Sequence, residues 1–368
     1  MRRIAMFVAA STMTLSLAGC GMLDATGSST SATPTKGNDI TVGVLMPDTI
    51  NTRYTNFDYP IMASKIAELT NKQGHVTYAN AASSASKQVT QMQKMIDDKV
   101  DVIILDAVDA HGIASSVKKA KDAGIPVIAY DRLAEGPIDS YVSFDNELVG
   151  EVQARTLLEG LGSNVDTSDK VIMVNGSPTD PNAKQFKTGA MSELSGKVTI
   201  AASYDTDKWD PVIAQKETAK AVAAIGKDNV AAVYSANDAM AGGIIKALKA
   251  AGVTNMPPIT GQDADLDAIQ RILAGEQYMT VYKPYPDEAE AAAEMAVYKV
   301  QGKDIQFDAL TQDQVDSPTT KNIPSQLVQV NAVTKSKIKD TVVADGIYKV
   351  SQICTAAYKS ACAAVGLK

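Results

Sequence analysis

Short apolar runs and longer segments of helical period alternate along the chain from residue 39 onward. The short runs are rich in Val and Ile, which predicts buried strands, and the longer segments predict amphipathic helices. In the first part of the chain, the expected strands are 40–46, 75–80, 100–108 and a run beginning at 127. The expected helices are 58–73, 86–98 and 112–124. Because uninterrupted apolar strands are typical of sheets buried on both faces, this alternation predicts a parallel sheet between two helical layers.

The same alternation restarts at residue 170 and repeats the architecture of the first part without repeating its sequence. The expected strands are 170–176, 198–204, 230–238 and one within 257–265. The expected helices are 182–194, 210–225 and 239–252. Beyond them we expect a strand at 278–284, a helix at 287–301, a late strand at 325–333 and a C-terminal extension over 334–368. The predicted fold class is therefore α/β, with two doubly wound parallel-sheet lobes.

Polar residues gather where the predicted strands end. Open parallel sheets bind their ligands at the carboxyl ends of the strands, so these positions form a candidate site. They are Arg53, Tyr54, Asp131, Arg132, Asn146, Asp180, Asn182, Trp209, Asn237, Asp238, Gln262, Asp263 and Lys283. Taken singly, Asp131 and Arg132 suit a surface ion pair, Trp209 suits a core position, and Asn237 suits a helix cap. Their joint placement favours a binding site, in which Asp131 would hold Arg132 while the remaining guanidinium donors face a ligand.

The candidate residues lack the arrangements that catalysis or metal binding requires. The two histidines, His75 and His111, are separated by a predicted helix and strand, and no cysteine is near either of them. No phosphate-binding glycine loop or nucleophile elbow follows a predicted strand. Carboxylates, amides and guanidinium groups suit neighbouring hydroxyl groups, and an aromatic ring suits the apolar C–H face of a sugar. The pattern therefore favours binding of a neutral sugar, without a metal, a cofactor or an enzymatic step.

Six segments, in order along the chain, resemble the motifs of one family. They are AYDRL, SFDNELVGE, NGSPTDPNAK, YSANDAMAGGIIKAL, GQDADLDAI and MTVYKP, within residues 40–335. Together they resemble the periplasmic sugar-binding proteins of ABC importers, most closely the D-xylose-binding and multi-sugar-binding type. The resemblance implies the type I periplasmic binding protein fold, in which two α/β lobes joined by three hinge strands close on a monosaccharide.

The resemblance also implies lobe boundaries and ligand contacts. The N-terminal lobe would comprise 39–145 plus 283–322 and the C-terminal lobe 147–279 plus 325–368, with hinges near 145, 281 and 323. The implied ligand-binding residues are Arg53, Tyr54, Asp131, Arg132, Asn146, Asp180, Asn182, Trp209, Asn237, Asp263 and Lys283. Pro181 stands where the family motif has Asn. This difference leaves D-xylose, D-fructose, L-arabinose, D-galactose and D-glucose open as ligands.

The implied function is capture of a monosaccharide by a monomeric protein, which delivers it to the permease subunits of an ABC transporter. A sugar sensor that presents its ligand to a membrane signalling protein would use the same cleft. A carrier for a non-sugar, such as autoinducer-2 or a nucleoside, is a further alternative. A nucleoside would favour an aromatic pair around its base, whereas the candidate residues are mostly carboxylates and amides.

The N-terminus has the layout of an export signal. Arg2 and Arg3 precede an apolar stretch, which predicts a secretory signal peptide over residues 1–19. The LAGC segment that ends at Cys20 resembles the lipobox of bacterial lipoproteins, so Cys20 is the expected acylation site. Residues 20–38 are rich in Ser, Thr and Gly, which predicts a flexible tether. We therefore expect an extracytoplasmic protein, lipid-anchored to the bacterial cell membrane.

Net charge and the remaining cysteines add two expectations. The net charge of −7 gives no general attraction to nucleic acid. Cys354 and Cys362 lie near the C-terminus, where export to an oxidising compartment favours a disulfide between them. Two separate buried thiols are the alternative, because the spacing alone imposes no geometry.

Overall fold

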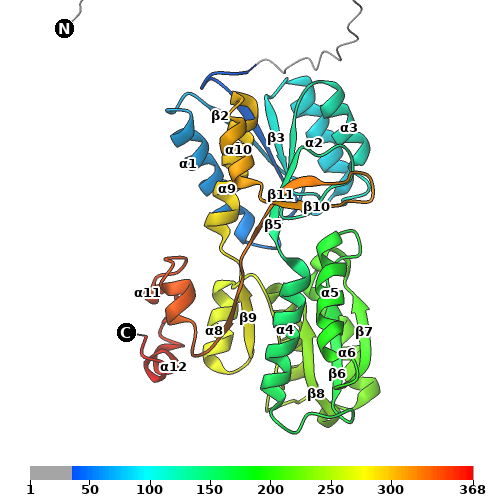
Figure 1. Ribbon diagram of the computed structural model, residues 1–368. Helices are drawn as coiled ribbons and strands as arrows, with labels where there is room; N and C mark the ends of the chain where they lie inside the picture. The colour runs from blue at the N-terminus through cyan, green and yellow to red at the C-terminus, as the bar shows by residue number, and fades with distance from the viewer. Residues whose placement is uncertain (1–34, 368) are drawn as a thin grey trace, which may run out of the picture. The chain divides into compact units, whose positions relative to one another are not determined.

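Helices alternate with the strands of two lobes in the computed structural model, which describes residues 35–367 (Figure 1). The predicted signal peptide, the acylation site Cys20 and most of the tether lie outside the described residues. Within residues 35–367, no helix is both long enough and apolar enough to cross a membrane.

The first lobe is built on a seven-stranded sheet with the order β10-β11-β5-β4-β3-β1-β2. Its strands are β1 (Thr41–Met46), β2 (His75–Asn80), β3 (Val102–Leu105), β4 (Val127–Tyr130), β5 (Ser140–Phe144), β10 (Asp313–Val315) and β11 (Ile323–Val328). Neighbouring strands are parallel, except that β10 is antiparallel to β11.

Helices cover both faces of this sheet. They are α1 (Tyr59–Leu69), α2 (Ala85–Asp97), α3 (Ala114–Asp122), α9 (Tyr285–Gln301) and α10 (Asp304–Leu310). Helices α1 and α9 pack together on one face, and α2 and α3 pack together on the other (Figure 1). The strands β3, β4 and β5 are consequently buried along their whole length. The uninterrupted apolar runs of β3 and β4 predict this burial, whereas β5, which contains Ser140 and Ser143, was not expected from the sequence.

The second lobe has a smaller sheet. Its parallel strands β6 (Lys170–Asn175), β7 (Thr199–Asp205) and β8 (Val230–Ser235) have the order β7-β6-β8. A bridge between Val233 and Ile259 continues from β8 toward the antiparallel pair β9 (Met279–Tyr282) and β12 (Asn331–Thr334). The helices are α4 (Asn146–Leu161), α5 (Pro181–Leu194), α6 (Pro211–Ile225), α7 (Asp238–Ala250) and α8 (Leu266–Ala274).

The chain passes between the lobes at three places. The first lies between β5 and α4, the second between β9 and α9, and the third between β11 and β12. The first two fall close to the expected positions near 145 and 281, but the third falls after Val328 rather than near 323. The single strand expected over 325–333 is also wrong, because β11 pairs with β5 in the first lobe whereas β12 pairs with β9 in the second. Apolar periodicity continues through both strands, so the pattern does not reveal the change of sheet.

Two glycines allow α4 and α5 to pack backbone against backbone. A Cβ on Gly150 would lie 2.0 Å from the carbonyl oxygen of Phe186, and a Cβ on Gly189 would lie 1.9 Å from that of Glu147. Helix α5 begins directly after the cap residue Asp180, whose carboxylate accepts a hydrogen bond from a backbone amide in its first turn. The close packing therefore positions the start of α5 at the carboxyl edge of the second sheet.

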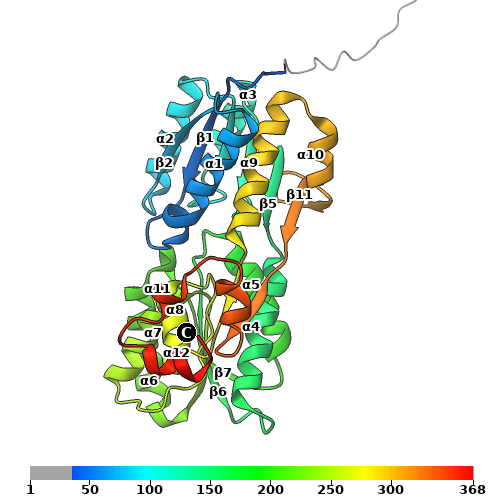
Figure 2. The ribbon, with the colours of Figure 1, turned by 90° about the vertical axis from the view of Figure 1, so that its left-hand side faces the viewer.

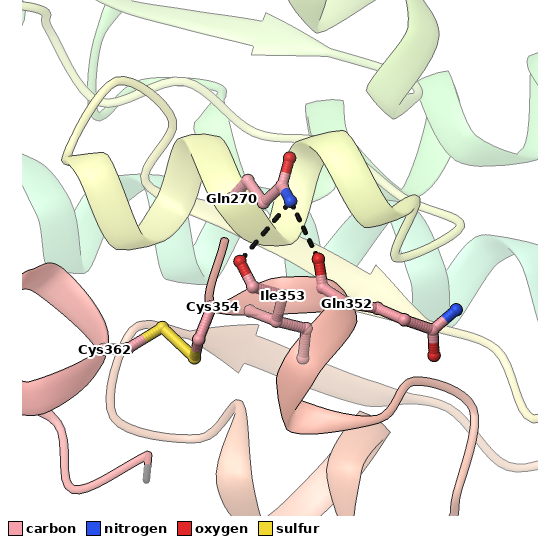
Figure 3. The surroundings of a disulfide bond; sticks show 5 residues. All are labelled: Gln270, Gln352, Ile353, Cys354 and Cys362. Carbon is pink, nitrogen blue, oxygen red and sulfur yellow. Dashed lines mark hydrogen bonds between the residues drawn. A yellow bond between two sulfur atoms is a disulfide. The ribbon is translucent and has the colours of Figure 1, made fainter. Parts of the chain in front are cut away.

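The C-terminal extension packs on α8. It contains the short helices η4 (Lys339–Val343), α11 (Val350–Ile353) and α12 (Lys359–Ala364), and its apolar side chains share one buried cluster with α8, β12 and the end of β9. Cys354 and Cys362 form the expected disulfide within it (Figure 3).

Gly189→Ala should lower the free energy of unfolding by about 1–3 kcal/mol, because the added Cβ must push α4 and α5 apart. Denaturant unfolding of both proteins measures the difference. The matched control is Gly242→Ala on α7, where the nearest atom to an added Cβ is Arg271 Nη1, at 3.4 Å, the end of a flexible side chain. Equal stabilities of the two variants would contradict the close helix contact.

Candidate ligand site between the two lobes

A cavity with about 380 Å³ of empty space lies at the carboxyl ends of the strands, with walls from both lobes. The lining residues are Asp48, Ile50, Asn51, Tyr54, Asp131, Arg132, Asp180, Asn182, Phe186, Trp209, Asn237, Gln262, Asp263 and Lys283. The cavity thus brings together every predicted ligand residue except Arg53 and Asn146.

Asp131 is the centre of the first-lobe wall. It follows β4 with a φ of 55°, and its Oδ2 accepts a hydrogen bond from the Tyr54 hydroxyl at 3.0 Å. Its Oδ1 lies 4.0 Å from both Arg53 Nη1 and Lys283 Nζ. Burial acts to raise the pKa of Asp131, but Lys283, Arg53 and Arg132 outweigh this effect and hold the pKa below its usual value. Asp131 is therefore a buried carboxylate that stays ionised.

Arg132 joins the two lobes. Its Nε lies 2.9 Å from Asp180 Oδ2 of the second lobe, and its guanidinium also faces Asp106 at 3.5 Å and Asp48 at 3.4 Å. The expected ion pair between Arg132 and Asp131 is wrong: the two side chains make no direct ion pair and are linked through the Tyr54 hydroxyl, which accepts from Arg132 at 3.3 Å and donates to Asp131. Burial raises the pKa of Asp180 against the opposing effect of Arg132. Most of the guanidinium donors are thus used by the protein itself.

Trp209 and Asp180 form the second-lobe wall. The indole Nε1 of Trp209 donates to Asp180 Oδ2 at 3.1 Å, and Phe186 meets the indole edge-on at a ring separation of 6.2 Å. A Cβ on Gly176 would lie 2.0 Å from a ring carbon of Trp209, so the absence of a side chain there makes room for the indole. Trp209 itself has a φ of 58°, a strained conformation for a large residue.

The remaining wall combines one cation with several amides. Lys283 Nζ lies 3.0 Å from Asp263 Oδ1, and Asn51 of the first lobe donates to Asp263 Oδ2 at 3.1 Å. Burial acts to lower the pKa of Lys283, but Asp263 and Asp131 outweigh it and the pKa is raised. Asn237 caps α7 by accepting a hydrogen bond from the amide of Met240 at 3.0 Å.

Arg53 and Asn146 lie away from the cavity lining. Arg53 is buried behind Asp131, where it binds Asp58 at 2.8 Å, the Tyr130 hydroxyl at 3.1 Å and Glu288. Burial raises the pKa of Glu288 to about 8, with Arg53 opposing the shift. Asn146 begins α4 at the first crossing between the lobes, and its amide donates to Ser143 Oγ at 3.4 Å.

Several lining residues were missing from the predicted ligand set. Asp48, Ile50 and Asn51 belong to the loop after β1, and the polar pair among them is a signal available in the sequence. Phe186 lies one helical turn after Asn182 on α5, so helical period identifies it once Asn182 is placed. Gln262 was recognised at a strand end but not assigned to the ligand.

Four buried acceptors on these walls have no hydrogen-bond partner within residues 35–367. They are Asp131 Oδ1, Asn182 Oδ1, Gln262 Oε1 and Asp263 Oδ1, and the last of them faces Lys283 Nζ at 3.0 Å. Unpaired buried acceptors are costly, so they suit a ligand that brings hydroxyl donors. The described part of the chain holds no cluster of His, Cys, Asp and Glu side chains that could bind a metal ion. The unpaired acceptors of the cavity suit a ligand that is held by hydrogen bonds.

A family model described as a periplasmic binding protein domain matches residues 42–304. The chain belongs to the periplasmic binding protein family. It is 37% identical over 321 residues to the D-xylose-binding periplasmic protein of Escherichia coli, covering 86% of this chain and 93% of that protein. It is 32% identical over 337 residues to a multiple sugar-binding periplasmic receptor of Rhizobium radiobacter, covering 85% and 92%.

A solved structure of the same kind matches the fold. It is an ABC transporter solute-binding protein of Clostridium phytofermentans with bound β-D-glucose, with a TM-score of 0.77, 26% identity and coverage of 85% of this chain and 99% of that chain. The family assignment confirms the resemblance drawn from the six motifs and the two-lobed α/β fold. Periplasmic binding proteins carry solutes without transforming them, so the chain is not an enzyme.

Gly176→Ala should displace the Trp209 indole, because the added Cβ collides with the ring. Trp209 is the one tryptophan of the chain, so fluorescence excited at the long-wavelength edge, where the 13 tyrosines absorb little, reports on this side chain. We expect red-shifted emission and stronger quenching by acrylamide, with Gly242→Ala as the control. A spectrum of Gly176→Ala that matches the wild type would contradict the contact between the glycine and the indole.

Proposed function

We propose that this protein is an extracytoplasmic solute-binding lipoprotein that binds a monosaccharide and delivers it to the permease of an ABC transporter. The observation that carries the proposal is the set of buried, unpaired acceptors around one cavity: Asp131 Oδ1, Asn182 Oδ1 and Gln262 Oε1. A sugar supplies several hydroxyl donors on a compact ring, and the indole of Trp209 suits its apolar C–H face.

The charges on the walls favour an uncharged sugar. The cavity is lined by four carboxylates, which are Asp48, Asp131, Asp180 and Asp263, and by two cations, which are Arg132 and Lys283. The cations already face carboxylates at 2.9 and 3.0 Å. A sugar phosphate or a sugar acid would therefore bring its negative charge into a cavity where the carboxylates outnumber the cations.

The relatives support the class of ligand. The E. coli relative is a D-xylose-binding protein, and the structural neighbour from C. phytofermentans holds β-D-glucose. We therefore propose D-xylose or a similar pentose or hexose, with D-fructose, L-arabinose, D-galactose and D-glucose as the other candidates.

Ligand binding would be coupled to closure of the lobes. In this structure the lobes are joined by Arg132 to Asp180, by Asn182 Nδ2 to the Asp131 carbonyl at 2.9 Å, and by the Ala110 amide to the Thr179 carbonyl at 3.3 Å. A sugar held between both walls adds contacts that exist only in the closed arrangement, so it shifts the population toward that arrangement. The permease can then distinguish loaded from empty protein.

Gln262→Leu should weaken sugar binding by about 5- to 150-fold, because a ligand hydroxyl loses its acceptor at a loss of about 1–3 kcal/mol. Stability should not fall, since Oε1 of Gln262 has no hydrogen-bond partner among the residues that the structure describes. A thermal-shift screen over the five candidate sugars selects the ligand, and calorimetric titration measures the affinity.

Gln326→Leu is the matched control. It makes the same substitution at another glutamine with an unpaired Oε1, on β11 and away from the cavity lining. Its affinity should equal that of the wild type. Unchanged affinity in Gln262→Leu would remove this residue from the site, and the absence of binding by all five sugars would contradict the proposed ligand class.

Cys20→Ala in the full chain should move the protein from the membrane fraction to the soluble extracytoplasmic fraction, because a lipid anchor requires the thiol. Cell fractionation followed by immunoblotting measures the distribution. Ser28→Ala, a substitution in the same tether, should leave the protein with the membrane. Membrane retention of the Cys20→Ala protein would contradict lipid anchoring.

A further inference from the structure

The part of the C-terminal extension that follows β12 and that the structure describes, residues 335–367, is attached firmly to the second lobe. Its Ile338, Val342 and Ile353 are buried in one cluster with α8 and β12. The side-chain amide of Gln270 on α8 donates to the carbonyls of Gln352 at 3.1 Å and Ile353 at 3.4 Å (Figure 3). The disulfide follows directly after this attachment, so the extension is both packed and cross-linked.

The same extension also reaches the first lobe. The ring of Tyr348 meets the ring of Phe57 edge-on, with their centres 5.9 Å apart. Phe57 lies in the short helix η1 (Tyr54–Asp58), which leads into α1 of the first lobe. Figure 2 shows the extension on the face of the second lobe turned to the viewer, with α11 nearer to the first lobe than α12.

The contacted helix belongs to the cavity wall. Tyr54, at its start, lines the cavity and donates to Asp131, and Asp58, at its end, pairs with Arg53. Phe57 also contacts Tyr285, at a ring separation of 5.5 Å, directly after the second crossing between the lobes. The extension therefore touches a first-lobe element, and the position of this element relative to the second lobe depends on lobe closure.

We infer that the C-terminal extension is a latch: it holds the lobes closed by placing Tyr348 against Phe57, and the disulfide keeps the extension ordered for this contact. Residues anchored in one lobe and packed on the other can keep their contact only while the lobes stay together. A cross-linked segment loses less entropy when it makes such a contact than a free segment does. The empty protein would thus spend more time closed than its cavity contacts alone allow.

Hydrogen–deuterium exchange of the full chain in sugar-free buffer tests the latch. The reporter is the peptide that contains Ala110, whose amide bonds to Thr179 across the lobes and lies outside the extension. Tyr348→Leu and Phe57→Leu should each raise exchange of this peptide about three- to tenfold, because the aromatic contact no longer opposes opening. The double variant should add little to either single one.

One control variant separates the latch from general stability, and a further variant tests the role of the disulfide. Tyr358→Leu changes a tyrosine that packs against the same cluster. It should leave exchange at Ala110 unchanged. The variant with Cys354→Ser and Cys362→Ser should raise exchange at Ala110 as Tyr348→Leu does.

Three outcomes would overturn the proposed latch. Wild-type exchange at Ala110 in both Tyr348→Leu and Phe57→Leu overturns it, and so does an increase confined to the extension and α8. An equal increase in Tyr358→Leu overturns it as well, because the effect would then be one of stability. The effect of the latch on sugar affinity rests on the proposed function. The exchange experiment uses no sugar, so its result tests the latch alone and does not depend on whether the proposed ligand is correct.

Discussion

Mutual compensation of buried charges at the strand ends is the constraint on which the cavity depends. Asp131, Asp180 and Asp106 are all removed from water, and each would be strongly destabilising without a nearby cation. Arg132 faces Asp180 and Asp106, and Lys283 stands near Asp131. Because Arg132 and Asp180 come from different lobes, this pairing forms only when the lobes approach each other. The charges thus link the geometry of the site to the arrangement of the whole chain.

Arg53 extends this compensation into the body of the first lobe. It ties the loop after β1 to β4 through the Tyr130 hydroxyl and to α9 through Glu288. The aromatic rings of Tyr54 and Tyr285 lie around its guanidinium, at 5.4 and 4.7 Å. Arg53 therefore supports the residues of the cavity wall from behind. This role explains why Arg53 is fully buried beside the cavity although it does not line it.

Sequence reasoning located most of the site because one rule covers it: the carboxyl ends of parallel strands meet along one edge. The sequence could not show that Tyr54 faces the cavity whereas Arg53 points into the first lobe. The start of η1 determines these two directions, and it leaves no periodic signal in the sequence. The sequence also suggested that Arg132 pairs with its neighbour Asp131. Its actual partner, Asp180, belongs to the other lobe and is distant in sequence, so adjacency could not identify it. The third crossing escaped for a similar reason, because β11 and β12 share one apolar pattern and only their partners differ.

The consecutive strands β11 and β12 belong to different lobes, and this has a consequence for folding during synthesis. Strand β11 pairs with β5 in the first sheet, and β12 pairs with β9 in the two-stranded sheet of the second lobe, so each lobe needs residues from near the end of the chain. Neither pairing can form until the last part of the chain has been made, and pairings between strands far apart in sequence form slowly. A chain built in this order stays incompletely folded until almost all of it has been made, which suits the extracytoplasmic location that we propose for this protein.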